Sequence, residues 1–270
     1  MKTAIIGDVH GMLGPLEALV AKLALGPGQR LVFVGDLVDK GPDPAGVVQF
    51  VRHLSETAEF ETILVEGNHE DKHIRYHYNT GARPGVARAM AEASPELPEL
   101  DAGLSADDRA FLAGAQAFLR VPAWNVLVVH GGIPGTMDHF PETPEQAAAL
   151  TGKARDRFRK ILRTRHISAD DGEFLSLGSH QPGDPFWAEA YDGRFGHVVF
   201  GHQPWLGPPA CFAHATGIDT AAVHGGDLTA LVLPEAGRAR FEAVPGFEHR
   251  PYRLDDRPPH PGSELRLTRR

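Results

Sequence analysis

The first 70 residues alternate short apolar segments with amphipathic segments, and this alternation limits the folds open to the chain more than any other feature. Residues 3–7, 31–34 and 62–65 are apolar runs of strand length. Between them, residues 15–23 and 43–54 place apolar side chains at helical spacing. A strand–helix–strand–helix–strand order predicts a parallel sheet with helices packed on it, and therefore an α/β fold.

The remainder of the chain is expected to hold helices first and strands afterwards. Residues 70–120 predict two or three helices, which we interpret as a helical insertion. Further strands are expected at 125–129, 197–200, 211–216, 228–233 and 238–244. We therefore predict a single domain over residues 1–245 and an extended C-terminal tail over 246–270. The last twenty residues are rich in proline, arginine and aspartate and are expected to lie loose on the surface.

Composition excludes several classes of protein. The 270 residues are 42% hydrophobic and 23% charged, as in a globular soluble protein. No apolar run approaches the roughly 18 residues that span a membrane, so no membrane contact is expected. The formal net charge of −8 argues against binding extended nucleic acid. Cys211 is the only cysteine, which rules out an internal disulfide and favours a cytoplasmic location. The oligomeric state is left open.

Residues of metal-ligand type follow the predicted strands. They come from the segments GDVHG, GDLVDKG, EGNHE, VVHGG and VVFGHQP, and they are Asp8, His10, Asp36, Asp39, Asn68, His69, His130 and His202. In open α/β sheets, ligands bind beyond the carboxyl ends of the strands. We therefore expect these side chains to converge although they are spread over residues 8–202. Each taken alone could equally cap a turn or bond to a loop.

The mixture of aspartate, histidine and asparagine suits divalent transition metals such as manganese, iron, zinc, cobalt or nickel, of which we expect manganese. The set is too large for one ion and fits two ions that share a bridging carboxylate, for which Asp36 is the central candidate. Two adjacent ions lower the pKa of a bridging water, supply a hydroxide nucleophile near neutral pH and bind phosphoryl oxygens.

The five motifs, in this order and spacing, resemble the calcineurin-like metallophosphoesterases, specifically the phosphoprotein phosphatase branch. The resemblance implies a four-layer αββα sandwich in which two mixed β-sheets are flanked by helices. It implies metal-dependent hydrolysis of a phosphoester or phosphoanhydride at two metal ions. It also implies a metal-ligand set made of Asp8, His10 and Asp36 for one ion and Asp36, Asn68, His130 and His202 for the other.

The resemblance further implies that His69 is the general acid and that Asp39 orients its imidazole. The chain departs from the family at Lys40, where arginine is common. Arginine binds phosphate through two parallel hydrogen bonds and lysine cannot, so other bases would be needed. Arg75, Arg163 and Arg165 are the candidates, although a solvated face of the predicted helix at 153–165 is the default interpretation of the last two.

The second half of the chain indicates the substrate. The stretches at 184–205 and 217–233, together with LRTRH, resemble bacterial bis(5'-nucleosyl)-tetraphosphatases of this branch. That resemblance implies dinucleoside polyphosphate substrates such as diadenosine tetraphosphate. The alternative is a serine/threonine or dual-specificity protein phosphatase, which acts on a phosphoprotein, and a third reading is an inactive, metal-bound regulatory protein. Residues 70–120 and 153–165 are expected to wall the site, and Trp187 and Trp205 either stack on a base or pack internally.

Overall fold

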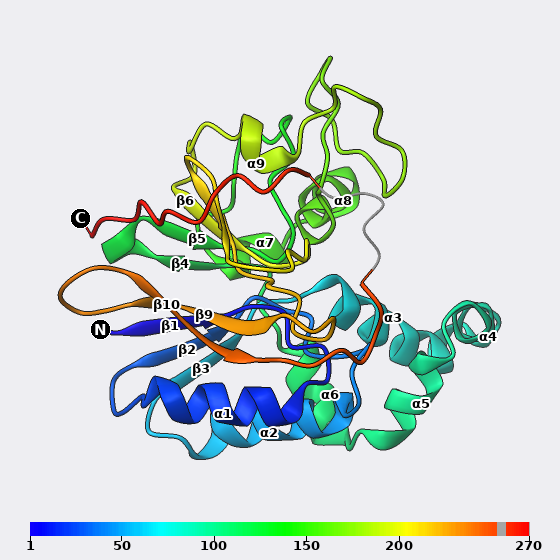
Figure 1. Cartoon of the computed structure of the whole chain (residues 1–270). Helices are drawn as coiled ribbons and strands as arrows, with labels where there is room; N and C mark the ends of the chain where they lie inside the picture. Colours follow the sequence, from blue (N-terminus) through cyan, green and yellow to red (C-terminus); the bar gives the residue numbers. More distant parts are fainter. Residues whose placement is uncertain (253–257, 270) are drawn as a thin grey trace.

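The chain folds into two five-stranded mixed β-sheets that lie face to face (Figure 1). The computed structural model describes residues 1–252 and 258–269. The first sheet has the order β10-β9-β1-β2-β3, in which β1, β2 and β3 run parallel and β9 is antiparallel to both of its neighbours. Its strands are β1 (Thr3–Ile6), β2 (Arg30–Phe33), β3 (Glu61–Leu64), β9 (Asp227–Leu233) and β10 (Arg240–Pro245).

The second sheet has the order β4-β5-β6-β8-β7. Its three central strands, β5, β6 and β8, run parallel, and the edge strands β4 and β7 are antiparallel to them. The strands are β4 (Leu119–Val121), β5 (Val126–Val128), β6 (His197–Phe200), β7 (Ala210–Cys211) and β8 (Ala215–Gly217). The segment at 211–216 was predicted as one strand, and this is wrong: Phe212 N donates to Ala215 O and the chain reverses there.

Helices cover the outer faces of both sheets, which confirms the predicted four-layer αββα sandwich (Figure 1). Helices α1 (Leu13–Leu23) and α2 (Pro44–Thr57) pack on the first sheet. Asp43 caps α2 by accepting from Gly46 N at 2.8 Å. The second sheet is covered by α7 (Pro144–Ala148), α8 (Gly152–Phe158), the 3₁₀ helix η2 (Arg159–Leu162) and α9 (Trp187–Ala190), and η1 (Pro122–Trp124) joins β4 to β5.

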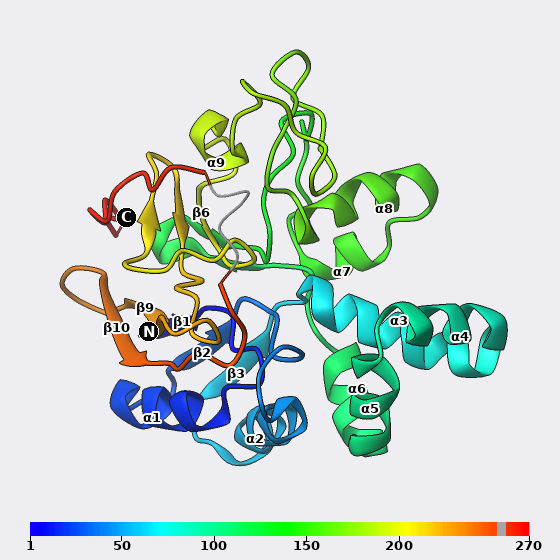
Figure 2. The same ribbon diagram turned by 45° about the vertical axis from the view of Figure 1, so that its right-hand side comes forward.

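The region between β3 and β4 forms more helices than expected. It holds α3 (Asn68–Ala82), α4 (Pro84–Ala93), α5 (Glu96–Gly103) and α6 (Ala106–Ala113), which extend to one side of the sheets (Figure 2). The basic segment at 153–165 is not one helix, because α8 ends at Phe158 and a 3₁₀ turn follows. As a result, Arg163 and Arg165 lie beyond the helical part of that segment.

The described part of the C-terminal tail is extended, but it is not loose throughout. Cys211 N donates to Gly262 O at 2.8 Å, and Leu265 and Leu267 pack against the core between the sheets. Residues 253–257 and 270 of the predicted tail lie outside the described residues. The division into a domain of residues 1–245 and a tail stays a prediction. Among the helices described, none combines the length and the apolar character needed to cross a membrane.

The core between the two sheets is made of interlocking aliphatic side chains. Ile5 and Val32 from the first sheet face Val128 and Val199 from the second, and all four are fully buried. Because this layer holds the two sheets in a fixed relation, it also sets the distance between the loops that follow their strands.

We predict that Ile5→Ala lowers the free energy of unfolding by about 2–5 kcal/mol, since it leaves a cavity among side chains that are fully buried. Urea denaturation followed by circular dichroism measures the change. Val86→Ala, at a side chain that is 45% exposed, is the control. An effect no larger than that of the control would contradict the role of this layer.

Candidate metal centre

Six parallel strands end at one place between the two sheets. In the first sheet, β1 is followed by Asp8 and His10, β2 by Asp36, and β3 by Asn68. In the second sheet, β5 is followed by His130 and β6 by His202, and β8 is followed by Asp219. The first six of these were predicted from the sequence. Asp219 was missed because β8 was merged with β7 in the predicted strand at 211–216.

Glycines let the ligand loops approach one another more closely than a residue with a side chain would allow. A Cβ atom at Gly201 would lie 1.9 Å from Asp8 Oδ1, and one at Gly67 would lie 2.3 Å from Asp36 Oδ1. His202 N, next to Gly201, donates to both oxygens of Asp8 at 3.1 Å. These glycines therefore provide space for a carboxylate.

Several side chains of the centre stand on left-handed backbone. Positive φ angles occur at His10 (47°), Asp36 (54°), Asp39 (64°), Lys40 (63°) and His202 (65°). Non-glycine residues adopt this conformation at a cost of about 1–3 kcal/mol each and keep it only where the surroundings hold it. The loops are therefore constrained by their contacts, and the constraint directs these side chains inward.

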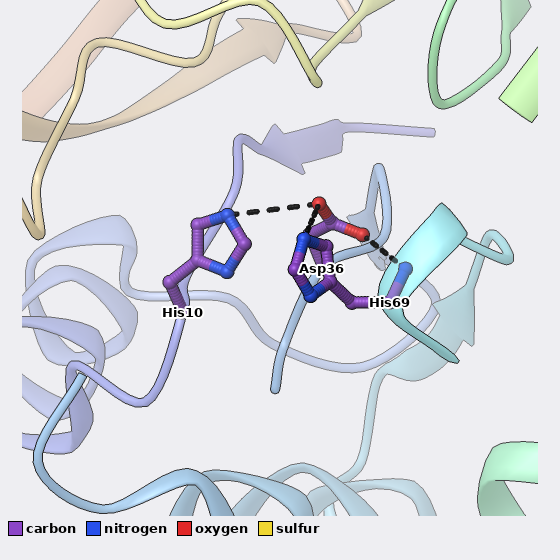
Figure 3. Close-up of side chains that lie close together, drawn as sticks. All are labelled: His10, Asp36 and His69. Carbon is purple, nitrogen blue, oxygen red and sulfur yellow. Dashed lines mark hydrogen bonds and ion pairs between the residues drawn. The ribbon is translucent and has the colours of Figure 1, made fainter. Parts of the chain in front are cut away.

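Asp36 lies at the middle of the cluster. Its Oδ2 is 3.6 Å from His10 Nε2 and 3.8 Å from His69 Nε2 (Figure 3). Its Oδ1 is 3.3 Å from His130 Nε2, which is 3.0 Å from Asn68 Oδ1. Two groups of potential ligands share Asp36: one contains His10 and His69, and the other contains His130 and His202. The first group thus differs from the predicted set by including His69 and leaving out Asp8.

His10 and His130 direct their Nε2 atoms toward the cluster. His10 Nδ1 lies 2.8 Å from Val38 O, and His130 Nδ1 lies 2.9 Å from Val34 O. A carbonyl oxygen can only accept, so each Nδ1 carries a proton and each Nε2 faces the cluster. With the proton on Nδ1, a neutral ring binds a metal ion through Nε2.

The charges in the cluster fit bound cations. Burial, followed by Asp219 and Asp36, raises the pKa of Asp8 well above its usual value. Burial, followed by Lys40, lowers the pKa of His10, so its imidazole adds no positive charge. Lys40 Nζ lies 2.7 Å from His10 Nε2 and partly compensates the carboxylates. Buried carboxylates, imidazoles and an amide together form a donor set that suits divalent metals.

Glu70 anchors the loop of Asp36 through hydrogen bonds to its backbone. Its side chain is fully buried and accepts from the backbone N–H groups of Asp36, Leu37 and Gly67 at 2.7–2.9 Å. Burial and then Asp36 raise its pKa to about 7. Glu70 was not predicted as a site residue, although its place inside the GNHE segment was a signal for it.

Asp39 is held between two histidines. Its Oδ2 lies 2.5 Å from His69 Nδ1. Its Oδ1 lies 2.6 Å from His73 Nε2, and His73 lies outside the five sequence motifs. His69 and His73 are four residues apart on α3 and so share one face of that helix.

A cavity of about 440 Å³ opens from the cluster. Asp36, Asn68, His69 and His202 form its polar floor. One wall carries His166 and residues 174–177, which include Phe174, Leu175 and Leu177. Residues 70–120 were expected to wall the site, and this is wrong, because α4–α6 extend away from the cavity (Figure 2). The segment at 153–165, also expected there, reaches the cavity only at its end, through Arg163 and Arg165. Trp187 and Trp205 are buried in the hydrophobic cluster between the second sheet and its helices, so they pack internally.

Three of the four predicted phosphate-binding bases line this cavity: Lys40, Arg163 and Arg165. Arg165 Nη2 donates to His202 O at 2.7 Å. Arg75 lies outside the lining with its side chain 59% exposed, since its position on α3 turns it toward solvent. The structure therefore does not bring Arg75 to the site.

A buried carboxylate connects these bases to α3. Asp71 accepts from Arg163 Nη2 and from Arg159 Nη2, both at 2.6 Å, and from Arg75 at 3.3 Å. Arg159 also makes a bidentate ion pair with Glu66 at 2.8 and 3.0 Å. This network fixes the segment that carries Arg163, and neither Asp71 nor Arg159 was predicted from the sequence.

Comparisons with known proteins agree with this geometry. Residues 1–228 match the calcineurin-like phosphoesterase family. A relative from Oceanobacillus iheyensis is 31% identical over 87% of this chain and 90% of its own length, and it is named an asymmetrical bis(5'-nucleosyl)-tetraphosphatase, PrpE. The protein of that name from Bacillus subtilis (strain 168) is 29% identical over 86% of this chain and 90% of its own length.

Two solved structures show the same fold. A crystal structure assigned as a diadenosine tetraphosphatase superposes with a TM-score of 0.66 and 26% identity, covering 91% of this chain and 94% of that one. A protein serine/threonine phosphatase from Saccharomyces cerevisiae superposes with a TM-score of 0.60 and 18% identity, covering 94% and 82%. The second likeness concerns the fold alone.

We predict that Asp36→Ala abolishes metal binding, because Asp36 is shared by the two groups of potential ligands. Metal content is measured by mass spectrometry after equilibration with manganese and gel filtration. The control is Asp192→Ala, at a carboxylate that is 60% exposed and distant from the cavity lining. A variant that retained a full complement of metal would show that Asp36 does not bridge.

Proposed function

We propose that this chain, which belongs to the calcineurin-like phosphoesterase family, hydrolyses dinucleoside polyphosphates such as diadenosine tetraphosphate. Family membership makes it a hydrolase that uses divalent metal ions. The substrate is supported by relatives of that name that match the chain over nearly their full length. The observation that carries the proposal is the cavity, which combines a metal-ligand floor, three bases and an apolar wall.

The proposed centre holds two divalent ions. Asp8, His10 and Asp36 would hold one ion, and Asp36, Asn68, His130 and His202 would hold the other, with manganese as the proposed metal. Bound there, the ions would supply an activated water and neutralise phosphoryl charge. The position of Asp36 supports this division, because it belongs to both groups of potential ligands.

His69 is proposed to donate a proton to the leaving oxygen. Its Nδ1 is engaged by Asp39, and its Nε2 points toward Asp36 and the cavity. A carboxylate on Nδ1 stabilises the protonated ring and fixes its direction, which is what a general acid requires. A catalytically inactive regulatory protein would not need this pair, and its presence argues against that reading.

Lys40, Arg163 and Arg165 are proposed to bind the phosphate chain, and Arg75 is left out. All three bases line the cavity, and Arg163 is held in place by Asp71. A chain of several phosphates carries more charge than the metal ions alone neutralise, so additional bases beside the floor suit a polyphosphate.

The wall formed by Phe174, Leu175 and Leu177 is proposed to bind a nucleobase. Lys160 Nζ lies 5.6 Å from the centre of the Phe174 ring, and the ring also lines the cavity. Aromatic and apolar side chains next to phosphate-binding bases fit a nucleoside phosphate. A protein phosphatase needs an open groove for a peptide, whereas the apolar wall beside the bases favours a nucleotide substrate.

The cytoplasm is the proposed location, since the single cysteine suits a reducing compartment. Cys211 is part-buried, and burial raises the pKa of its thiol to about 11, which keeps it unreactive.

A panel of substrates tests the proposed function. We expect kcat/KM to be highest for diadenosine tetraphosphate, lower for p-nitrophenyl phosphate and lowest for phosphopeptides. Dialysis against EDTA should abolish hydrolysis and manganese should restore it. Chromatography of the products distinguishes unequal from equal cleavage, and unequal products are expected because the relatives are named asymmetrical. A preference for phosphopeptides would favour the protein phosphatase instead.

We predict that Phe174→Ala raises KM for diadenosine tetraphosphate by about tenfold, since stacking of a base on an aromatic ring contributes about 1–3 kcal/mol. KM for p-nitrophenyl phosphate should stay unchanged, because it lacks a nucleobase. Phe247→Ala removes another exposed phenylalanine, away from the cavity, and serves as the control. Equal changes for both substrates would rule out a nucleobase site at this wall.

A further inference from the structure

We propose that His73 is a positioning residue for proton donation: by holding the second oxygen of Asp39, it fixes the direction in which His69 presents its Nε2 to the cavity. This inference rests on the proposed role of His69 as the general acid. It assigns a function to a histidine that lies outside the five sequence motifs.

The hydrogen bonds of Asp39 support this role. Oδ2 binds His69 Nδ1 at 2.5 Å, and Oδ1 binds His73 Nε2 at 2.6 Å. A carboxylate held at one oxygen can turn about its Cβ–Cγ bond, whereas one held at both oxygens cannot turn without losing a bond. Burial raises the pKa of Asp39, but the bonds from His69 and His73 outweigh it, and the carboxylate stays ionised.

The helix and the loop explain why a second bond is needed. His69 and His73 both project from α3, which is tied to the Asp36 loop through Glu70. Asp39 itself stands on left-handed backbone, with φ of 64°, and so does Lys40 after it. Such a loop relaxes unless its side chains are anchored. His73 is buried, so its bond to Asp39 does not compete with water.

Loss of this anchor should affect one step of the reaction selectively. Protonation of the leaving oxygen matters for a poor leaving group such as phenol and matters little for p-nitrophenol, which departs as a stable anion. Metal binding and phosphate binding contribute equally to hydrolysis of both aryl esters. The ratio of kcat for phenyl phosphate to kcat for p-nitrophenyl phosphate therefore isolates proton donation.

The experiment compares His73→Ala, His73→Gln and the reference variant His69→Asn. We expect His73→Ala to lower kcat for phenyl phosphate by about tenfold, within the range that a general acid contributes, while KM and kcat for p-nitrophenyl phosphate stay near the wild-type values. His73→Gln should restore most of the loss, since its amide nitrogen can donate to Asp39 Oδ1. His69→Asn should show the same selectivity more strongly. The double variant His69→Asn/His73→Ala should have a kcat for phenyl phosphate no lower than that of His69→Asn alone.

His77→Ala is the matched control. His77 lies one turn further along α3, pairs with Asp101 at 2.8 Å and is half exposed, so its removal should leave both rates unchanged. Metal content and melting temperature are recorded for every variant, and His73→Gln covers the case in which His73→Ala does not fold.

Equal losses on both esters, or losses that add in the double variant, would overturn the positioning role and leave His73 a structural residue. If His69→Asn is selective and neither His73 variant is, this inference alone fails. If His69→Asn shows no selectivity, the acid assignment in the proposed function fails and the inference fails with it.

Discussion

The carboxylate of Asp36 is the contact on which the arrangement depends. It meets histidines from the first sheet on one oxygen and a histidine from the second sheet on the other, so it joins the two halves of the sandwich at the metal centre. A buried carboxylate in such a position is unfavourable unless cations or hydrogen bonds compensate it. The backbone bonds to Glu70, the close packing at Gly67 and the rigid layer around Ile5 all keep it in place.

Much of the metal centre could be predicted because its chemistry follows the strands. Short apolar runs mark the strands of a parallel sheet, and a ligand-type residue directly after each run must lie at the same edge. The family resemblance adds the roles of single residues and the second sheet. Asp219 escaped prediction because β7 and β8 are too short and too close together to be told apart in the sequence.

Other features depend on contacts between segments that carry no shared pattern. His73 is a helical histidine whose partner lies in a loop 34 residues away, and Asp71 gathers arginines from 88 and 92 residues away. The wall at 174–177 belongs to an irregular segment without hydrophobic periodicity. Periodicity reports which face of an element is buried, but it does not report which loop will cover a site.

The hydrogen bond from His202 to Asp8 spans 194 residues, and this separation bears on how the protein is made. On the ribosome, the carboxylates near the N-terminus emerge long before β6 exists to enclose them. A fragment that ends before His202 lacks both the N–H group that binds Asp8 and one imidazole of the cluster. The centre therefore matures late in synthesis, and metal capture and completion of the fold become one coupled event.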